Sequence, residues 1–131
     1  MLATTPSPSA KDAPRILVVD DEEIVRKVLR SLLEQAGYNV ICAANGADAL
    51  EQLARIPRPD AILVDLFMPQ MNGWCFANEL KASVELDRVP LFVLTGAGPH
   101  WGMPVPENRL LRKPLESDRL LRLLSEVVGK P

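Results

Sequence analysis

Short runs of apolar, mostly β-branched residues alternate with longer amphipathic stretches along most of this chain. Residues 15–20 (RILVVD) form the first run, which is typical of a strand buried on both faces of a sheet. In 21–37 the apolar residues recur at three- and four-residue spacing, which predicts a helix. This alternation constrains the fold strongly, because parallel strands need crossover connections and helices supply them.

The same alternation continues through the rest of the chain. Further strands are predicted at 38–43, 60–65, 89–95 and 108–113, and further helices at 46–56, 73–83 and 116–128. Asn45 and Asn72 stand directly before two of these helices and are suited to cap them. Gly37 and Gly129 are suited to end the first and last helices. The pattern predicts an α/β domain whose parallel sheet is covered by helices on both faces.

One helix is missing from this pattern, between the fourth and fifth strands. The segment 96–108 contains three prolines and three glycines, and proline in a helix interior removes an amide donor and clashes with the preceding turn. We therefore expect 97–106 to be an ordered or semi-ordered loop without a helix of two or more turns. Trp101, Met103 or Val105 is expected to cover the adjacent strands. The sequence leaves open whether Trp101 anchors a partner or the loop is merely shortened.

Length, charge and hydropathy limit the class of protein. A chain of 131 residues suits one domain, expected at 15–129, after a disordered tail at 1–14 that is small, polar and proline-rich. The net charge is −2 and the basic residues are dispersed, which argues against direct nucleic-acid binding. No apolar run is long enough for membrane insertion, and residues 1–14 lack the apolar stretch of a secretory signal, so neither is expected. We therefore expect a cytoplasmic protein.

The few residues with metal-binding or redox chemistry form no recognisable site. Cys42 and Cys75 have no metal-binding spacing and are too few for a disulfide framework. We interpret both as buried, small apolar residues that stay reduced. His100 is the single histidine and is expected on an exposed loop.

Polar residues collect at the carboxyl ends of four predicted strands. They are Asp20 and Asp21 at the end of the first strand, Asp65 at the end of the third, Thr95 at the end of the fourth and Lys113 at the end of the fifth. Ligands of open parallel sheets bind at this edge, so these side chains are expected to converge. Three carboxylates repel one another unless a cation neutralises them, and an all-oxygen set favours Mg²⁺. A lysine and a hydroxyl beside the metal suit a phosphoryl group, with a carboxylate as its nucleophile.

The motifs VVDD, ILVDLFMPQMNGW, FVLTG and LLRKP, in this order and spacing, resemble the receiver domain of bacterial two-component response regulators. The resemblance covers residues 15–128. It implies a flavodoxin-like, doubly wound, five-stranded parallel sheet of order 2-1-3-4-5 with helices on both faces. In this chain the fourth helix of that fold is expected to be missing or degenerate.

The resemblance also implies a role for each site residue. Asp65 is then the phospho-acceptor, and Thr95 and Lys113 hold the phosphoryl oxygens. The Mg²⁺ site consists of Asp20, which acts largely through water, Asp21, Asp65 and the backbone carbonyl of Phe67. Met68, Pro69 and Gly73 would shape the loop after the acceptor, and the Lys113–Pro114 peptide bond would be cis.

The implied partners are a sensor histidine kinase or phosphotransfer protein, which donates the phosphoryl group, and a downstream protein target. Such a chain is a switch rather than an enzyme acting on an outside substrate. A homodimer, and a place within a longer protein, are left open. The alternative is a non-phosphorylated pseudo-receiver that serves as a docking module. A phosphatase of the haloacid dehalogenase type fits poorly, because its first strand needs an Asp-x-Asp motif.

Two residues depart from the family pattern. Phe67, two residues after the acceptor, occupies a position that is usually polar or smaller, and its ring is expected over the site. It could hinder an attacking water, or it could be a hydrophobic lid without kinetic effect. Leu110 stands where the family has an aromatic residue whose movement accompanies that of the threonine.

Overall fold

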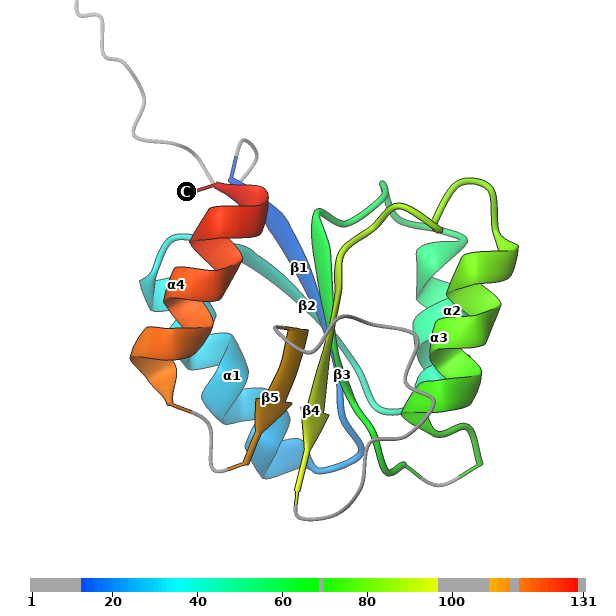
Figure 1. Cartoon of the computed structure of the whole chain (residues 1–131), viewed down its shortest axis with the longest axis horizontal. Helices are drawn as coiled ribbons and strands as arrows, with labels where there is room; N and C mark the ends of the chain where they lie inside the picture. The colour runs from blue at the N-terminus through cyan, green and yellow to red at the C-terminus, as the bar shows by residue number, and fades with distance from the viewer. Residues whose placement is uncertain (1–12, 69, 97–108, 114–115, 130–131) are drawn as a thin grey trace, which may run out of the picture.

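The computed structural model describes residues 13–68, 70–96, 109–113 and 116–129, and a five-stranded parallel sheet forms its centre (Figure 1). The strands are β1 (Arg15–Val19), β2 (Asn39–Ala43), β3 (Ala61–Asp65), β4 (Leu91–Thr95) and β5 (Leu110–Arg112). Their order is β2-β1-β3-β4-β5 and every pairing is parallel, which confirms the predicted sheet. In Figure 1 the arrows of β4 and β5 point to the lower edge, so all five carboxyl ends lie there.

Helices cover both faces of the sheet, as predicted. In the part of the chain that the structure describes they are α1 (Glu23–Gln35), α2 (Gly46–Leu53), α3 (Gly73–Ala82) and α4 (Ser117–Val128). Helices α1 and α4 lie on one face, and α2 and α3 lie on the other (Figure 1). The helix predicted at 46–56 is shorter than expected, because the chain tightens into a turn after Leu53, where the amide of Arg55 bonds to the carbonyl of Gln52 three residues earlier.

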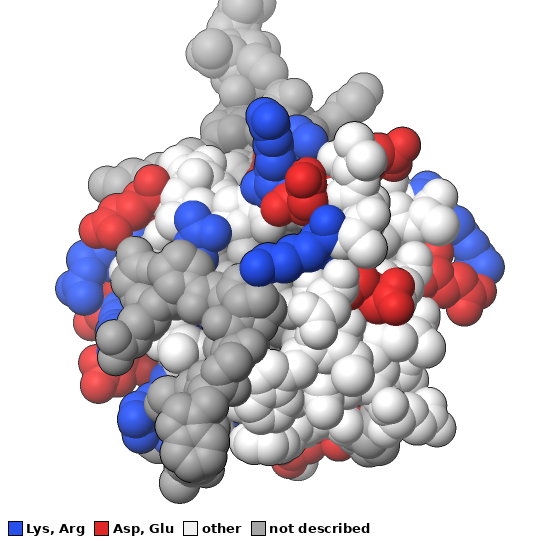
Figure 2. All heavy atoms as spheres, turned by 45° about the vertical axis from the view of Figure 1, so that its right-hand side comes forward, with Lys and Arg blue, Asp and Glu red and all other residues white. Residues whose placement is uncertain are grey.

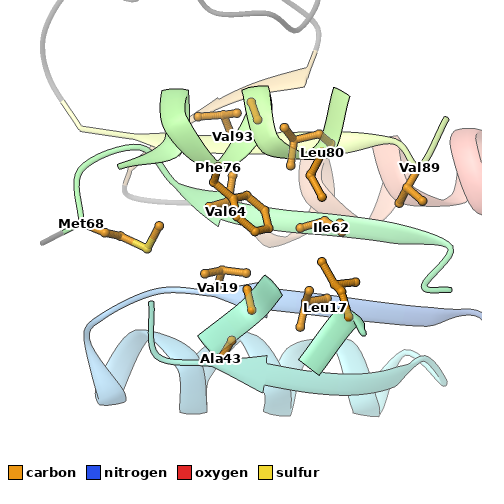
Figure 3. Packing of buried hydrophobic residues seen from close by; sticks show 14 of the residues in the cluster. Leu17, Val19, Ala43, Ile62, Val64, Met68, Phe76, Leu80, Val89 and Val93 are labelled. Atoms are coloured by element: carbon orange, nitrogen blue, oxygen red, sulfur yellow. The ribbon is translucent and has the colours of Figure 1, made fainter. Parts of the chain in front are cut away.

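Each face of the sheet packs its own hydrophobic core, because alternate strand residues point to opposite faces. On the α2–α3 face, Phe76 of α3 lies over Val64 of β3 (Figure 3). On the other face, Leu63 of β3 packs with Leu29 of α1 and Leu120 of α4. Strands β3 and β4 are buried along their whole length, which fixes the position of the side chains at their carboxyl ends.

The predicted helix caps are confirmed. The side chain of Asn45 accepts a hydrogen bond from the Asp48 amide (2.7 Å), and that of Asn72 accepts one from the Cys75 amide (2.9 Å). Gly37 and Gly129 follow their helices with φ angles of 101° and 84°, which L-residues with a side chain rarely adopt.

The expectation that both cysteines are buried is wrong for Cys75. It lies on the exposed side of α3, because the next two residues, Phe76 and Ala77, are the ones that face the sheet. Cys42 is half-buried on β2 and packs against the α1–α4 core. Both thiols are free in the structure.

Several predictions fall outside the described residues. They concern most of the tail at 1–14, the loop at 97–106 with His100 and Trp101, and the Lys113–Pro114 bond. At the described end of the tail, the carbonyls of Ala13 and Pro14 accept hydrogen bonds from Asn39. No helix among the described residues is long and apolar enough to cross a membrane.

Two helices begin with a glycine, and the structure predicts different consequences for replacing each one by alanine. A Cβ at Gly73 would lie 2.9 Å from the backbone Cα of Leu66, whereas one at Gly46 would meet the flexible side chain of Met71. We expect Gly73→Ala to lower the free energy of unfolding by about 1–3 kcal/mol, because backbone must move. We expect Gly46→Ala to cost less than about 1 kcal/mol, because methionine adapts. Urea unfolding followed by circular dichroism measures both, and equal losses would contradict this explanation.

Candidate functional site

Three carboxylates meet at the carboxyl ends of the neighbouring strands β1 and β3. Asp20 and Asp21 follow β1 directly, and Asp65 is the last residue of β3. One oxygen from each lies within 4.8 Å of the others. Asp20 is fully buried and Asp65 is 5% exposed, whereas Asp21 is exposed to solvent. The predicted convergence of these three residues is therefore confirmed.

Asp20 leaves one buried carboxylate oxygen without a hydrogen bond. Its backbone N–H donates to the Ala43 carbonyl (3.2 Å), and its Oδ1 accepts from the Glu22 amide (2.9 Å). Its Oδ2 is the one buried side-chain nitrogen or oxygen, among the described residues, that lacks a hydrogen-bond partner. A buried acceptor without a hydrogen bond, beside two more carboxylates, fits a hard cation such as Mg²⁺, which prefers oxygen ligands.

Lys113 supplies one positive charge to this cluster. Its Nζ lies 3.5 Å from Asp20 Oδ2 and 3.4 Å from Asp65 Oδ1. The backbone holds it there, because the Lys113 amide donates to the Thr95 carbonyl (2.8 Å) just beyond the β4–β5 pairing. One ammonium cannot neutralise three carboxylates, so the site keeps an excess of negative charge.

The surroundings shift the pKa values of two site residues. Burial raises the pKa of the Asp65 carboxyl above its ordinary value of 3.8, and the charge of Asp20 raises it further. Lys113 and the backbone N–H of Phe67 act in the opposite direction without cancelling this shift. Burial acts to lower the pKa of Lys113, but the charges of Asp20 and Asp65 outweigh it, and that pKa is raised.

Thr95 brings a hydroxyl to the same edge of the sheet. It is fully buried at the end of β4, and the strand register places Asp65 beside Leu94, the residue before it. Its Oγ1 donates only a long hydrogen bond, 3.4 Å, to the Gly96 carbonyl. Because that bond is weak, the hydroxyl is available to an acceptor that approaches from the site.

The loop after Asp65 is anchored at both ends. Met68 is buried in the α2–α3 core, and the Gly73 amide donates to the Leu66 carbonyl (2.8 Å). Between the buried residues Leu66 and Met68, Phe67 is 55% exposed, and its ring meets that of Trp74 edge-on with the centroids 5.7 Å apart. Both readings of Phe67, a water barrier and a lid without kinetic effect, stay predictions.

Sequence patterns did not single out Arg26, which contacts this site from α1. Its Nη1 donates to the backbone carbonyl of Asp20 at 2.7 Å. An arginine on the polar side of an amphipathic helix is ordinary in a sequence, so no pattern distinguishes it from Lys27 or Arg30 on the same helix.

Comparison with known protein families supports what this geometry suggests. The model of the response regulator receiver domain matches residues 16–125. The chain belongs to this family. The carboxylate cluster therefore lies in a receiver domain of two-component signalling.

Two relatives resemble this receiver over almost their whole length. It is 32% identical to protein PilH of Pseudomonas aeruginosa over 119 residues, which are 88% of this chain and 98% of PilH. It is 31% identical to the polar-differentiation response regulator DivK of Brucella anthropi over 122 residues, which are 87% of this chain and 95% of DivK.

A solved structure adds an observation on the metal. The receiver domain of the sensor histidine kinase PA1611 from Pseudomonas aeruginosa PAO1 superposes with a TM-score of 0.78 and 29% identity, covering 90% of this chain and 99% of that one. That structure holds a magnesium ion in its active-site cleft. The acidic cluster of this receiver offers oxygen ligands alone, the donor type that suits Mg²⁺.

The raised pKa of Asp65 predicts a pH-dependent effect of Asp65→Asn on stability in EDTA. Because the pKa is higher in the folded protein, the folded state loses stability as the pH rises through that value. An amide does not ionise, so at pH 7 we expect a melting temperature a few degrees above wild type. The difference in melting temperature between Asp65→Asn and wild type should shrink as the pH falls towards 3.8. Melting followed by circular dichroism measures it.

Asp87→Asn is the matched control, because Asp87 is exposed in the connection between α3 and β4 and should show little change. A melting temperature of Asp65→Asn below that of wild type at pH 7 would contradict the prediction.

Proposed function

We propose that this receiver accepts a phosphoryl group on Asp65 in the presence of Mg²⁺. The observation that carries the proposal is the buried Asp20 Oδ2, which accepts no hydrogen bond, within a cluster of three carboxylates that has one ammonium group. The excess negative charge of such a cluster favours binding of a divalent cation. A cation next to a carboxylate nucleophile suits transfer of an anionic phosphoryl group. The magnesium-containing receiver of PA1611 supports the same assignment.

In the proposed step an Asp65 oxygen attacks the phosphorus of a phosphohistidine. The new O–P bond forms while the P–N bond to the imidazole breaks, and the imidazole nitrogen keeps that electron pair and then takes a proton from water. Lys113 already lies beside Asp65 Oδ1 and would balance charge on the phosphoryl oxygens. The Thr95 hydroxyl would donate a hydrogen bond to one of those oxygens. Mg²⁺, when bound, supplies further neutralisation of that charge.

We assign the metal to Asp20, Asp21, Asp65 and the backbone carbonyl of Phe67. Asp21 is the exposed member, so it can meet a hydrated ion directly, whereas Asp20 is buried and would act largely through a bound water. The donor would be a sensor histidine kinase or phosphotransfer protein. The phosphorylated domain, residues 15–129, would signal to a downstream protein by contact rather than by catalysis on an outside substrate, alone or as a homodimer.

The face of the receiver that includes α2 and α3 carries no single block of charge. Figure 2 shows basic side chains interspersed with acidic ones, with a largely uncharged area below them. Nucleic-acid binding needs clustered cations to neutralise phosphates. This face therefore supports a protein partner better than a nucleic acid.

Labelling with acetyl phosphate tests the proposed acceptor. With Mg²⁺, the intact mass of the wild-type chain should increase by one phosphoryl group, whereas Asp65→Ala should show no increase because the nucleophile is gone. Asp87→Asn, which removes an exposed carboxylate far from the site, should be labelled like wild type. Labelling of Asp65→Ala at the wild-type level would refute the assignment, and a wild-type chain that is never labelled would favour a docking module.

Titration calorimetry tests the metal ligands. Asp21→Ala should weaken Mg²⁺ binding at least as much as Asp20→Ala, because a lost direct ligand costs at least as much as one acting through water. We expect the Mg²⁺ affinity of Asp21→Ala to fall by about tenfold or more. Asp87→Asn is the control, since Asp87 is exposed in the connection between α3 and β4. Wild-type affinity in Asp21→Ala would count decisively against this metal site.

A further inference from the structure

Arg26 connects helix α1 to the loop that carries two of the acidic residues. Its Nη1 donates a hydrogen bond of 2.7 Å to the backbone carbonyl of Asp20, six residues earlier in the chain. Its own backbone amide bonds to the Glu22 carbonyl (3.1 Å), so the first turn of α1 holds the base of the side chain. A guanidinium-to-carbonyl bond of this length is charge-assisted and stronger than a neutral one.

The bonded carbonyl belongs to the peptide group between Asp20 and Asp21. A peptide group is planar and includes the nitrogen and Cα of Asp21. A bond that holds the Asp20 carbonyl oxygen therefore also restrains these two atoms of Asp21. Two other hydrogen bonds hold Asp20: its backbone N–H donates to the Ala43 carbonyl, and its Oδ1 accepts from the Glu22 amide. Among the described residues, no side-chain hydrogen bond or ion pair holds the exposed Asp21 carboxylate itself. Its direction therefore depends on the backbone that Arg26 restrains.

We propose that Arg26 is a positioning residue for the metal site: it orients the Asp20–Asp21 peptide so that the Asp21 carboxylate faces Asp65. This inference rests on the proposed Mg²⁺-dependent function, and it assigns to α1 a part in building the site. Arg26 itself does not contact the metal or the phosphoryl group in this role.

Charge and position predict opposite effects of removing Arg26. A guanidinium near a cation site repels the cation, so if its charge were all that mattered, Arg26→Ala would strengthen Mg²⁺ binding. If Arg26 orients Asp21, the same variant weakens binding, because the ligand is no longer held in place. The sign of the change thus separates the two roles.

Arg30 provides a matched control on the same helix. It lies one turn, about 6 Å, beyond Arg26. It lines the same groove of about 300 Å³, together with Glu23, Lys27 and Cys42. Within the described ranges its exposed side chain has no hydrogen bond or ion pair. Arg30→Ala therefore removes an equal charge from the same surface without releasing the Asp20 carbonyl.

Calorimetric titration of wild type, Arg26→Ala, Arg26→Lys and Arg30→Ala with Mg²⁺ provides the test. We expect Arg26→Ala to bind about tenfold more weakly, a typical loss when a supporting residue of a metal site is removed. Arg26→Lys keeps the charge and one donor and should fall between Arg26→Ala and wild type, and Arg30→Ala should bind like wild type or slightly tighter. Wild-type or tighter binding by folded Arg26→Ala would overturn the proposal. If Arg26→Ala does not fold, wild-type binding by Arg26→Lys would overturn it.

Amide hydrogen exchange in EDTA gives a readout that needs no metal. In Arg26→Ala we expect faster exchange at the Glu22 amide, which is bonded to Asp20 Oδ1, with no change at this position in Arg30→Ala. Unchanged exchange in Arg26→Ala would overturn the positioning role even if the wild-type chain bound no Mg²⁺. Failure of wild type to bind Mg²⁺ would instead count against the proposed metal site, so the two hypotheses fail separately.

Discussion

The repulsion among three carboxylates at one edge of the sheet is the constraint on which the rest of this structure depends. Asp20 and Asp65 are almost fully buried, and burial makes the mutual repulsion of their charges expensive. Lys113 offsets part of this cost, and the charges of the two carboxylates raise its pKa and so favour its charged form. The remaining negative charge destabilises the folded state when no metal is bound. For the same reason it favours binding of a cation.

The fold is suited to bearing this cost. Strands β3 and β4 are buried along their length between two hydrophobic cores, so the sheet cannot easily relax to separate the charges. The loop after Asp65 is held by buried Met68 and by the close approach of Gly73 to Leu66. Helix α1 adds a third restraint through Arg26. Stability gained in the cores is thus used to hold an electrostatically unfavourable arrangement in place.

Much of the fold and of the site could be predicted because the relevant signals are local. Apolar runs and helical spacing located each described strand and helix. Asn45 and Asn72 are caps because the backbone N–H groups in the first turn of a helix have no carbonyl acceptor within that helix. The site residues were found because parallel strands bring their carboxyl ends together. Errors arose where the outcome depends on packing: the early end of α2 and the exposure of Cys75 follow from how each helix meets the sheet.

The sequence by itself determined the strand–helix alternation, the acidic, hydroxyl and ammonium groups at the strand ends, and the family to which they belong. These properties depend on residue type and spacing, which are present in the chain before it folds. Only the tertiary structure decided that Asp20 Oδ2 is left without a hydrogen bond, that Lys113 is shared between Asp20 and Asp65, and that Arg26 rather than Arg30 bonds to the Asp20 carbonyl. Hydrogen bonds and ion pairs of this kind depend on distances of a few ångströms between separate elements, and such distances are set by how the helices pack on the sheet.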